Sequence, residues 1–294
     1  AATLPAGASP TITAADCTKL TEVISTPPPL LDADTQAASD ILGTVDPSHG
    51  FAVFSRLPAQ FTWWMRSVGS TVTGHGLGAA MHEVTHAIDN TLQFTCFNDG
   101  RARYFADGVI HQIGLTVGGT SNYHIAAEAV PAALKVSRPR FDAYITGASA
   151  YSGNDFRVLL DELNAYTGVA NFEVNLLESP KYSYLATNGD LNVGGMVDFM
   201  LFTQAYLQAA RLNHPATYAA IQTDTSTVTY LIFAWARAER ILAAAYPYSV
   251  AAGGTQVVPL DVLAAVYSPA LLDELDRLGI SHRTAADWSA TYLR

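Results

Sequence analysis

Two histidines and a glutamate stand at positions in this sequence where they could carry out metal-dependent chemistry. They are His82, Glu83 and His86, inside a segment from 78 to 93 that is expected to form a helix. Residues four apart lie on one face of a helix, so both imidazoles can reach a single ion. Glu83 stands beside them and could take a proton from water bound to that ion. Zinc-dependent hydrolysis requires this arrangement.

The residues around this pattern favour a helix that packs into a core. Met81, Val84 and Ile88 fall at i, i+3 and i+7, so they would bury one side of the helix. The alternative interpretation is a pair of histidines on a half-buried helix, with Glu83 in solvent. The run His82-Glu83-Val84-Thr85-His86 resembles the H-E-x-x-H motif of the zincin metallopeptidases, and the resemblance implies a bound Zn2+ ion.

The third ligand of the implied zinc ion does not follow from the motif. A catalytic zinc takes three protein ligands and keeps an open position. The metzincin subfamily has a glycine and then a histidine at the positions that Asp89 and Leu92 fill here, which excludes that subfamily. Gluzincins use a downstream glutamate, and none occurs between Glu83 and Glu128. The resemblance therefore implies a gluzincin-like protein with a distant glutamate ligand.

Glu162 is the preferred candidate for that ligand. It lies on a segment from 154 to 166 that is predicted to be helical, with Gly168 just past the end. The run Glu162-Leu163-Asn164-Ala165-Tyr166 resembles the E-x-x-A-Y pattern found downstream of H-E-x-x-H in several zincin-like families. It would place Tyr166 one turn from the metal, where its hydroxyl could stabilise an oxyanion.

Glu128 is the alternative third ligand. His124 precedes it by four residues, which is a suggestive spacing. Pro131 would end that helix three residues later and leave Glu128 near a helix C-terminus, where negative charge is disfavoured. A third possibility is that neither glutamate binds metal, because surface glutamates commonly only solvate a helix or pair with arginine.

Charge and hydropathy exclude several classes of partner. The net charge is −10, and the basic residues are almost all arginines scattered along the chain without forming a stripe. This argues against nucleic acid or an anionic membrane surface. No stretch reaches the ~18 apolar residues that span a bilayer. The longest candidate, 230–236, runs at once into Arg237, Glu239 and Arg240. The resemblance to the zincin metallopeptidases implies a protein or peptide substrate as the partner.

The cysteines and the first residues favour an exported protein. Cys17 and Cys96 are the two cysteines, so they allow one intramolecular disulfide, which needs an oxidising compartment. The alternative is a pair of buried free thiols. The chain begins with small residues and no Met, as expected after removal of a signal peptide or pro-segment. Together with the low lysine and high alanine content, this suggests a secreted or periplasmic bacterial enzyme.

The pattern of elements predicts an α+β fold, and its division into two parts resembles the two-lobed zincin layout, which implies a zincin-like fold with a cleft between the parts. Residues 1–29 are expected to form an extended arm because they end in three prolines. Residues 30–121 would hold a small sheet and the motif helix, and residues 122–294 would be mainly helical. The whole is expected to be one compact catalytic unit.

Individual elements follow from periodicity and turn residues. Strands are expected at 51–54, at 61–73 and between 94 and 113, with turns at Asn98-Asp99-Gly100 and Asp107-Gly108. The glycines of 74–79 are expected to form a loop that turns into the motif helix. Further helices are expected at 30–42 (closed by Gly43), 196–212, 215–221, 227–245 and 260–278.

These observations predict a secreted, zinc-dependent metallopeptidase. His82, His86 and Glu162 would hold the ion, and Glu83 would act as general base in the hydrolysis of a peptide bond. One alternative is a catalytically inactive binding protein with a zincin fold. Another is a zinc hydrolase that acts on a non-peptide amide or on a glycan-linked substrate.

Overall fold

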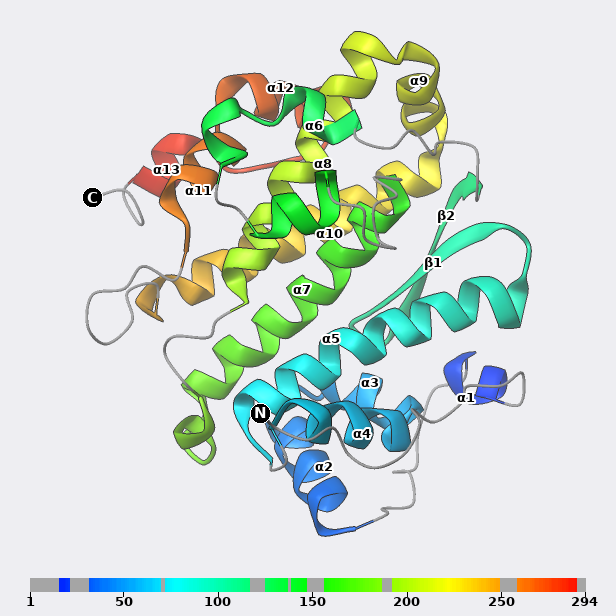
Figure 1. The fold of residues 1–294 in the computed structure, drawn as a ribbon, viewed down its shortest axis with the longest axis vertical. Helices are drawn as coiled ribbons and strands as arrows, with labels where there is room; N and C mark the ends of the chain where they lie inside the picture. Colours follow the sequence, from blue (N-terminus) through cyan, green and yellow to red (C-terminus); the bar gives the residue numbers. More distant parts are fainter. Residues whose placement is uncertain are drawn as a thin grey trace. The chain divides into compact units, whose positions relative to one another are not determined.

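The computed structural model describes most of the chain, in eight stretches. They are residues 16–21, 32–69, 72–116, 125–136, 139–146, 156–186, 192–248 and 258–289. The described residues are mainly helical, with one two-stranded sheet of β1 (Arg101–Ala106) and β2 (Val109–Thr116) (Figure 1). This agrees with the coarse α+β expectation. Most of the predicted N-terminal arm, and the first two residues of the predicted 154–166 helix, lie outside the described residues.

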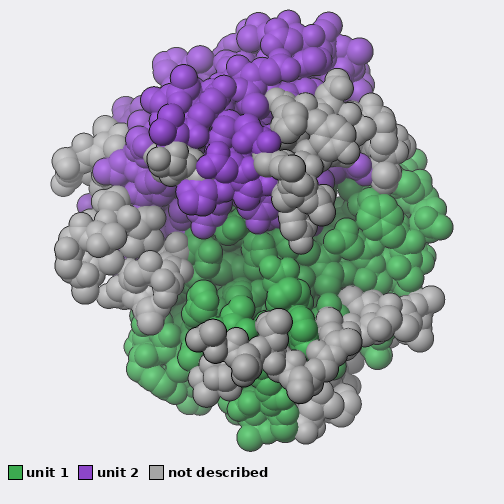
Figure 2. Space-filling view, in the orientation of Figure 1, with its two compact units in different colours: residues 1–111, 164–192 green, residues 112–163, 193–294 purple. Residues whose placement is uncertain are grey.

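The chain forms two compact units, each made of stretches distant in sequence (Figure 2). Unit 1 comprises residues 1–111 and 164–192, and unit 2 comprises residues 112–163 and 193–294. One long helix, α7 (Phe156–Glu178), runs without interruption through the boundary at 163/164.

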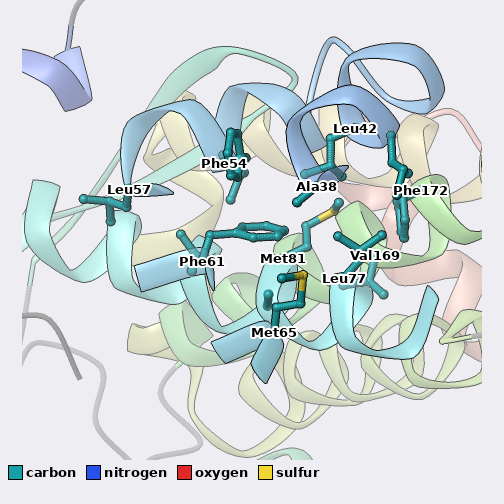
Figure 3. Packing of buried hydrophobic residues seen from close by; sticks show 14 of the residues in the cluster. Ala38, Leu42, Phe54, Leu57, Phe61, Met65, Leu77, Met81, Val169 and Phe172 are labelled. Carbon is teal, nitrogen blue, oxygen red and sulfur yellow. The ribbon is translucent and has the colours of Figure 1, made fainter. Parts of the chain in front are cut away.

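Unit 1 is built around the motif helix α5 (Gly74–Thr91). Leu77 and Met81 of α5 are fully buried together with Phe61 and Met65 of α4 and Phe172 of α7 (Figure 3). The other elements of this unit are α1 (Cys17–Thr21), α2 (Ala33–Val45), α3 (Gly50–Arg56), α4 (Pro58–Gly69), the π-helix η2 (Leu92–Phe97) and η5 (Ser183–Leu185).

Unit 2 is centred on α8 (Val193–Asn213). This helix is apolar on nearly all sides, as expected for a helix surrounded by others, and it packs against α6, α9, α10, α11 and α12. The remaining elements are α6 (Ile125–Ala129), η3 (Ala132–Leu134), η4 (Phe141–Thr146), α9 (Pro215–Thr223), α10 (Thr225–Ala245), η6 (Tyr246–Tyr248), α11 (Leu260–Val266), α12 (Pro269–Arg277) and α13 (Ala285–Ser289).

Two predicted strands are helices. The segment 51–54 belongs to α3, because Gly50, Val53, Phe54 and Leu57 are buried at i, i+3, i+4 and i+7, a helical period. The carboxylate of Asp46 accepts hydrogen bonds from the backbone N–H groups of His49 (3.3 Å) and Gly50 (3.0 Å), so the start of α3 is capped. The segment 61–73 lies mainly in α4, where Trp63 and Trp64 are half-buried and form an edge-to-face pair.

The predicted loop at 74–79 is the first part of α5. The Thr73 hydroxyl accepts a hydrogen bond from the backbone N–H of Gly76 at 3.0 Å, which caps the helix four residues earlier than expected. The glycines are used for close packing: a Cβ at Gly74 would lie 2.5 Å from the carbonyl oxygen of Leu185. At Gly78 it would lie 3.3 Å from a methyl group of Val169 on α7. The absence of side chains therefore lets the backbone of Leu185 and the side chain of Val169 approach α5 closely.

The other predictions need smaller corrections. The hairpin turn at Asp107-Gly108 is confirmed, with positive φ at both residues as in a type I′ turn, but Phe97 belongs to η2 and not to a strand. Gly43 lies inside α2 and does not close it. The segment 260–278 is divided into α11 and α12, because Pro269 begins a new helix. The helices predicted at 196–212, 215–221 and 227–245 are present as α8, α9 and α10.

Candidate metal centre

Helix α5 presents both motif histidines side by side. Their Nε2 atoms are 3.1 Å apart, and their rings meet edge to face with centroids 4.6 Å apart. The opposite side of the helix is anchored as predicted, since Met81, Val84 and Ile88 are fully buried. The histidines and Glu83 are half-buried, so the motif stands at the margin of the core.

Helix α7 presents a second pair of side chains with the same spacing. Glu162 is only 3% exposed, and Tyr166 follows one turn later. The ring of Tyr166 packs edge to face against the ring of His82, with a centroid separation of 4.5 Å. Two i, i+4 pairs, one on each helix, therefore meet through His82 and Tyr166.

The three expected ligands are close together. His82, His86 and Glu162 each offer one ligand atom, and these three atoms lie within 4.8 Å of one another. Among the described residues, these side chains form the group that could bind a metal ion. Neighbouring ligand atoms of a tetrahedral zinc lie about 3.3 Å apart for bonds of ~2.0–2.1 Å. The two nitrogens already match that spacing.

The chemistry of these donors fits a divalent transition metal. Two imidazole nitrogens 3.1 Å apart repel each other if both present lone pairs, unless a proton or a cation lies between them. Burial of a carboxylate is costly unless a cation or hydrogen bonds compensate it. Two histidines and a carboxylate form the ligand set of a catalytic zinc, in which one position stays open.

Glu128, the alternative ligand, is engaged elsewhere. Its carboxylate accepts hydrogen bonds from Asn213 Nδ2 (2.6 Å) and pairs with His214 Nε2 (3.0 Å). The hydrogen bonds from His214 and then Asn213 lower the pKa of Glu128. Its neighbour His124 lies outside the described residues. The group that converges on the motif histidines contains Glu162.

A buried polar network holds α5, α7 and β1 together beside these residues. Asp89 on α5 accepts hydrogen bonds from the backbone N–H of Phe105 (2.6 Å) and from Asn164 Nδ2 on α7 (3.1 Å). Asn164 Nδ2 also donates to the carbonyl oxygen of Phe105, at 3.1 Å. Asp89 and Asn164 are 3% and 2% exposed. Sequence reasoning used neither residue as part of a site, and the only available signal was a polar residue at a buried helix position.

Gly168 does not end its helix, contrary to expectation. Helix α7 continues to Glu178, and Gly168 lies inside it. A Cβ at this position would lie 2.2 Å from Nε2 of His49, a fully buried residue whose Nδ1 accepts a hydrogen bond from the backbone N–H of Asp107. The glycine is therefore explained by the close approach of an imidazole to the helix backbone, and a capping role is not needed.

The predicted disulfide is present. Cys17 and Cys96 are bonded, with Cα atoms 5.4 Å apart and a sequence separation of 79. The bond joins α1 to η2, which continues directly from the motif helix. Nε of Arg56 donates to the carbonyl oxygen of Leu20 in α1, so a second contact holds this segment.

Comparisons with known proteins identify no relative. No protein-family model matches the sequence, and no curated protein and no solved structure matches it either. In the part of the chain that the structure describes, no helix combines the length and apolarity needed to cross a membrane. The functional argument therefore depends on the site itself.

Proposed function

We propose that this chain is a zinc-dependent metallopeptidase in which His82, His86 and Glu162 hold the ion. The proposal depends on one observation above all, the convergence of these three side chains within 4.8 Å. The run from His82 to His86 resembles the zincin motif, and this supports the proposal independently because the motif depends on sequence alone. A gluzincin-like fold with a distant glutamate is part of the same proposal.

The residues around the ligands have distinct roles in this proposal. A bound zinc ion would lower the pKa of a water molecule and polarise the substrate carbonyl. Glu83 follows His82 directly and takes the proton from the attacking water. Tyr166, whose ring lies against His82, donates a hydrogen bond from its hydroxyl to the carbonyl oxygen as negative charge develops there.

The metal assignment is tested by analysis of purified protein. About one zinc per chain is expected, because one three-ligand group is proposed. His82→Ala, His86→Ala and Glu162→Ala should each lose the ion. Glu128→Ala is the matched control, since it removes a carboxylate that pairs with His214 and should leave zinc content unchanged. Full occupancy in the Glu162→Ala protein, with loss in Glu128→Ala, would move the third ligand to Glu128.

The catalytic assignment is tested by separating metal binding from turnover. Glu83→Gln should keep zinc and reduce hydrolysis of a peptide library by several orders of magnitude, because the amide cannot accept the proton. Tyr166→Phe should also keep zinc and lose about 10–1,000-fold in kcat. Unchanged activity in Glu83→Gln would remove this residue from the mechanism.

Wild-type protein that binds zinc also allows the two alternative functions to be distinguished. If the metal-loaded protein cleaves no member of a peptide library but cleaves a non-peptide amide or a glycan-linked substrate, the peptidase assignment is wrong and the hydrolase assignment stands. If it cleaves none of these, the inactive binding protein is favoured. These outcomes do not depend on the identity of the third ligand.

We further infer that the protein works in an oxidising compartment, outside the cell or in the periplasm. The Cys17–Cys96 disulfide supports this, because such bonds persist mainly where thiols are not kept reduced. Thiol titration of the denatured, non-reduced protein isolated from its source should find no free thiol. Two free thiols would contradict the inference.

A further inference from the structure

The network of Asp89, Asn164 and Phe105 lies within one helical turn of the proposed ligands. Asp89 follows His86 by three residues on α5, and Asn164 follows Glu162 by two residues on α7. The three members form a closed set of hydrogen bonds, with both oxygens of Asp89 used and with Asn164 Nδ2 shared between Asp89 and the Phe105 carbonyl. A movement of either helix that disturbs this network also moves a ligand.

Apolar packing alone does not set the register of two helices sharply. The hydrophobic effect is non-directional, so the burial of Leu77, Met81, Val169 and Phe172 does not by itself select one register of α7 against α5. Hydrogen bonds are directional and weaken steeply with distance and angle. Because Asp89 and Asn164 are almost fully buried, water cannot replace a bond that they lose. The network therefore penalises a slide against which the apolar contacts do not by themselves select.

We propose that Asp89 and Asn164 are positioning residues that fix the register of the two ligand helices before any metal binds. The inference rests on the proposed metal site and extends it to residues that touch neither metal nor substrate. It states that the ligand set is preorganised by the chain and is not assembled by the ion. The alternative is that the hydrogen-bond network contributes only to folding stability and has no effect on metal binding.

A matched pair of variants separates these two roles. Asn164→Ala removes a buried amide that bonds two acceptors, Asp89 and the Phe105 carbonyl. Gln204→Ala removes a comparable buried amide on α8 in unit 2, which donates to the carbonyl oxygens of Val266 and Leu271. Both should lower the unfolding temperature. Only Asn164→Ala should affect the metal.

The first readout is the affinity of the folded proteins for Zn2+ and for Co2+, at a temperature where circular dichroism shows each variant to be folded. Asn164→Ala should weaken both by about 10–100-fold and change the visible absorption spectrum of bound Co2+, as loss of a supporting contact does at metal sites. Gln204→Ala should stay within about twofold of wild type. If Asn164→Ala does not fold, Asp89→Asn replaces it in the experiment. Asp89→Asn keeps the shape of the side chain but places an amide opposite the amide of Asn164.

The second readout uses metal-free protein. Backbone amide exchange across residues 82–88 should be nearly the same in wild type with and without Zn2+, and faster in metal-free Asn164→Ala. If Asn164→Ala binds both ions as wild type does, with an unchanged Co2+ spectrum, the positioning role is refuted while the metal site stands. If wild type binds no Zn2+, the proposed function fails and the positioning role fails with it.

Discussion

Replacement of Gly168 by alanine should destabilise the protein, although alanine is the better helix former. In an exposed helix this change gains about 1 kcal/mol. Here the new Cβ would lie 2.2 Å from Nε2 and 2.8 Å from Cδ2 of His49, whereas ordinary contacts begin at 3.4 Å. The His49 ring cannot easily retreat, because it is fully buried, bonded to the Asp107 N–H and stacked on Phe105.

The expected size follows from these opposing effects. Overpacking of a well-filled core costs about 1–3 kcal/mol. Loss of the hydrogen bond that His49 accepts would add roughly 1 kcal/mol. Set against the gain in helix propensity, the net loss for Gly168→Ala is about 1–3 kcal/mol. A matching change, Gly43→Ala inside α2, should instead stabilise by up to about 1 kcal/mol. Its new Cβ meets only the Phe51 ring, at 3.6 Å.

Urea unfolding of both variants decides the matter. The midpoint should fall for Gly168→Ala and rise for Gly43→Ala, with slopes unchanged. In a double-mutant cycle, His49→Ala combined with Gly168→Ala should be more stable than the sum of the single changes predicts, because the smaller residue makes room. A Gly168→Ala protein that gains stability as Gly43→Ala does would show that His49 does not limit the approach to α7.

Two further predictions concern unit 1, one its disulfide and the other Asp32, whose carboxylate caps the start of α2 by accepting a hydrogen bond from the backbone N–H of Thr35 at 3.0 Å. Removal of the disulfide by Cys17→Ala with Cys96→Ala should lower the free energy of unfolding by up to about 4 kcal/mol, because the bond closes a long loop in the unfolded chain. The loss is measured as a fall in the urea midpoint, and the reduced wild-type protein should unfold like the variant. The pKa of Asp32 is lowered from 3.8 to about 2, first by the hydrogen bond from the backbone N–H of Thr35 and then by Arg66. The stabilisation of α2 by the Asp32 carboxylate is therefore complete above the unfolded pKa of 3.8 and is lost as the pH falls through about 2. Asp32→Ala should therefore cost about 1 kcal/mol at neutral pH and nothing below pH ~2, and an equal loss at both would contradict the capping role.

Periodicity was informative where a helix has one clear environment. The segment of α10 is predictable because its buried residues repeat at helical spacing over many turns, and the segment of α8 is predictable because it is a long apolar run without proline. The hairpin was recognised because Asp-Gly supplies two residues that tolerate positive φ. The three candidate ligands were found from residue type and spacing, because coordination chemistry restricts both.

Local composition predicts the wrong secondary structure where contacts between distant parts of the chain determine it. The run Phe51-Ala52-Val53-Phe54 has strand-forming residues, but its burial follows the helical set Gly50, Val53, Phe54 and Leu57. The local pattern predicts a helix end or a loop at glycines 43, 74, 76, 78 and 168, whereas each of these glycines lies inside a helix. At 74 and 168 the reason is a contact with a residue distant in sequence, Leu185 or His49, which no local pattern contains.

The candidate site shows why spacing alone cannot build a centre from two helices. An i, i+4 pair establishes that His82 and His86 share a face, and the same holds for Glu162 and Tyr166. It does not establish the distance between the helices or their register. The distance between α5 and α7 depends on residues without side chains, such as Gly78, because a Cβ added there would lie 3.3 Å from Val169. Register depends on directional contacts such as Asn164 with Asp89. A change at either kind of residue should therefore alter metal affinity at the proposed site without replacing a ligand. Gly78→Ala, whose Cβ would lie 3.3 Å from both Val169 and Glu173 of α7, should weaken metal binding because it strains the contact between the two helices.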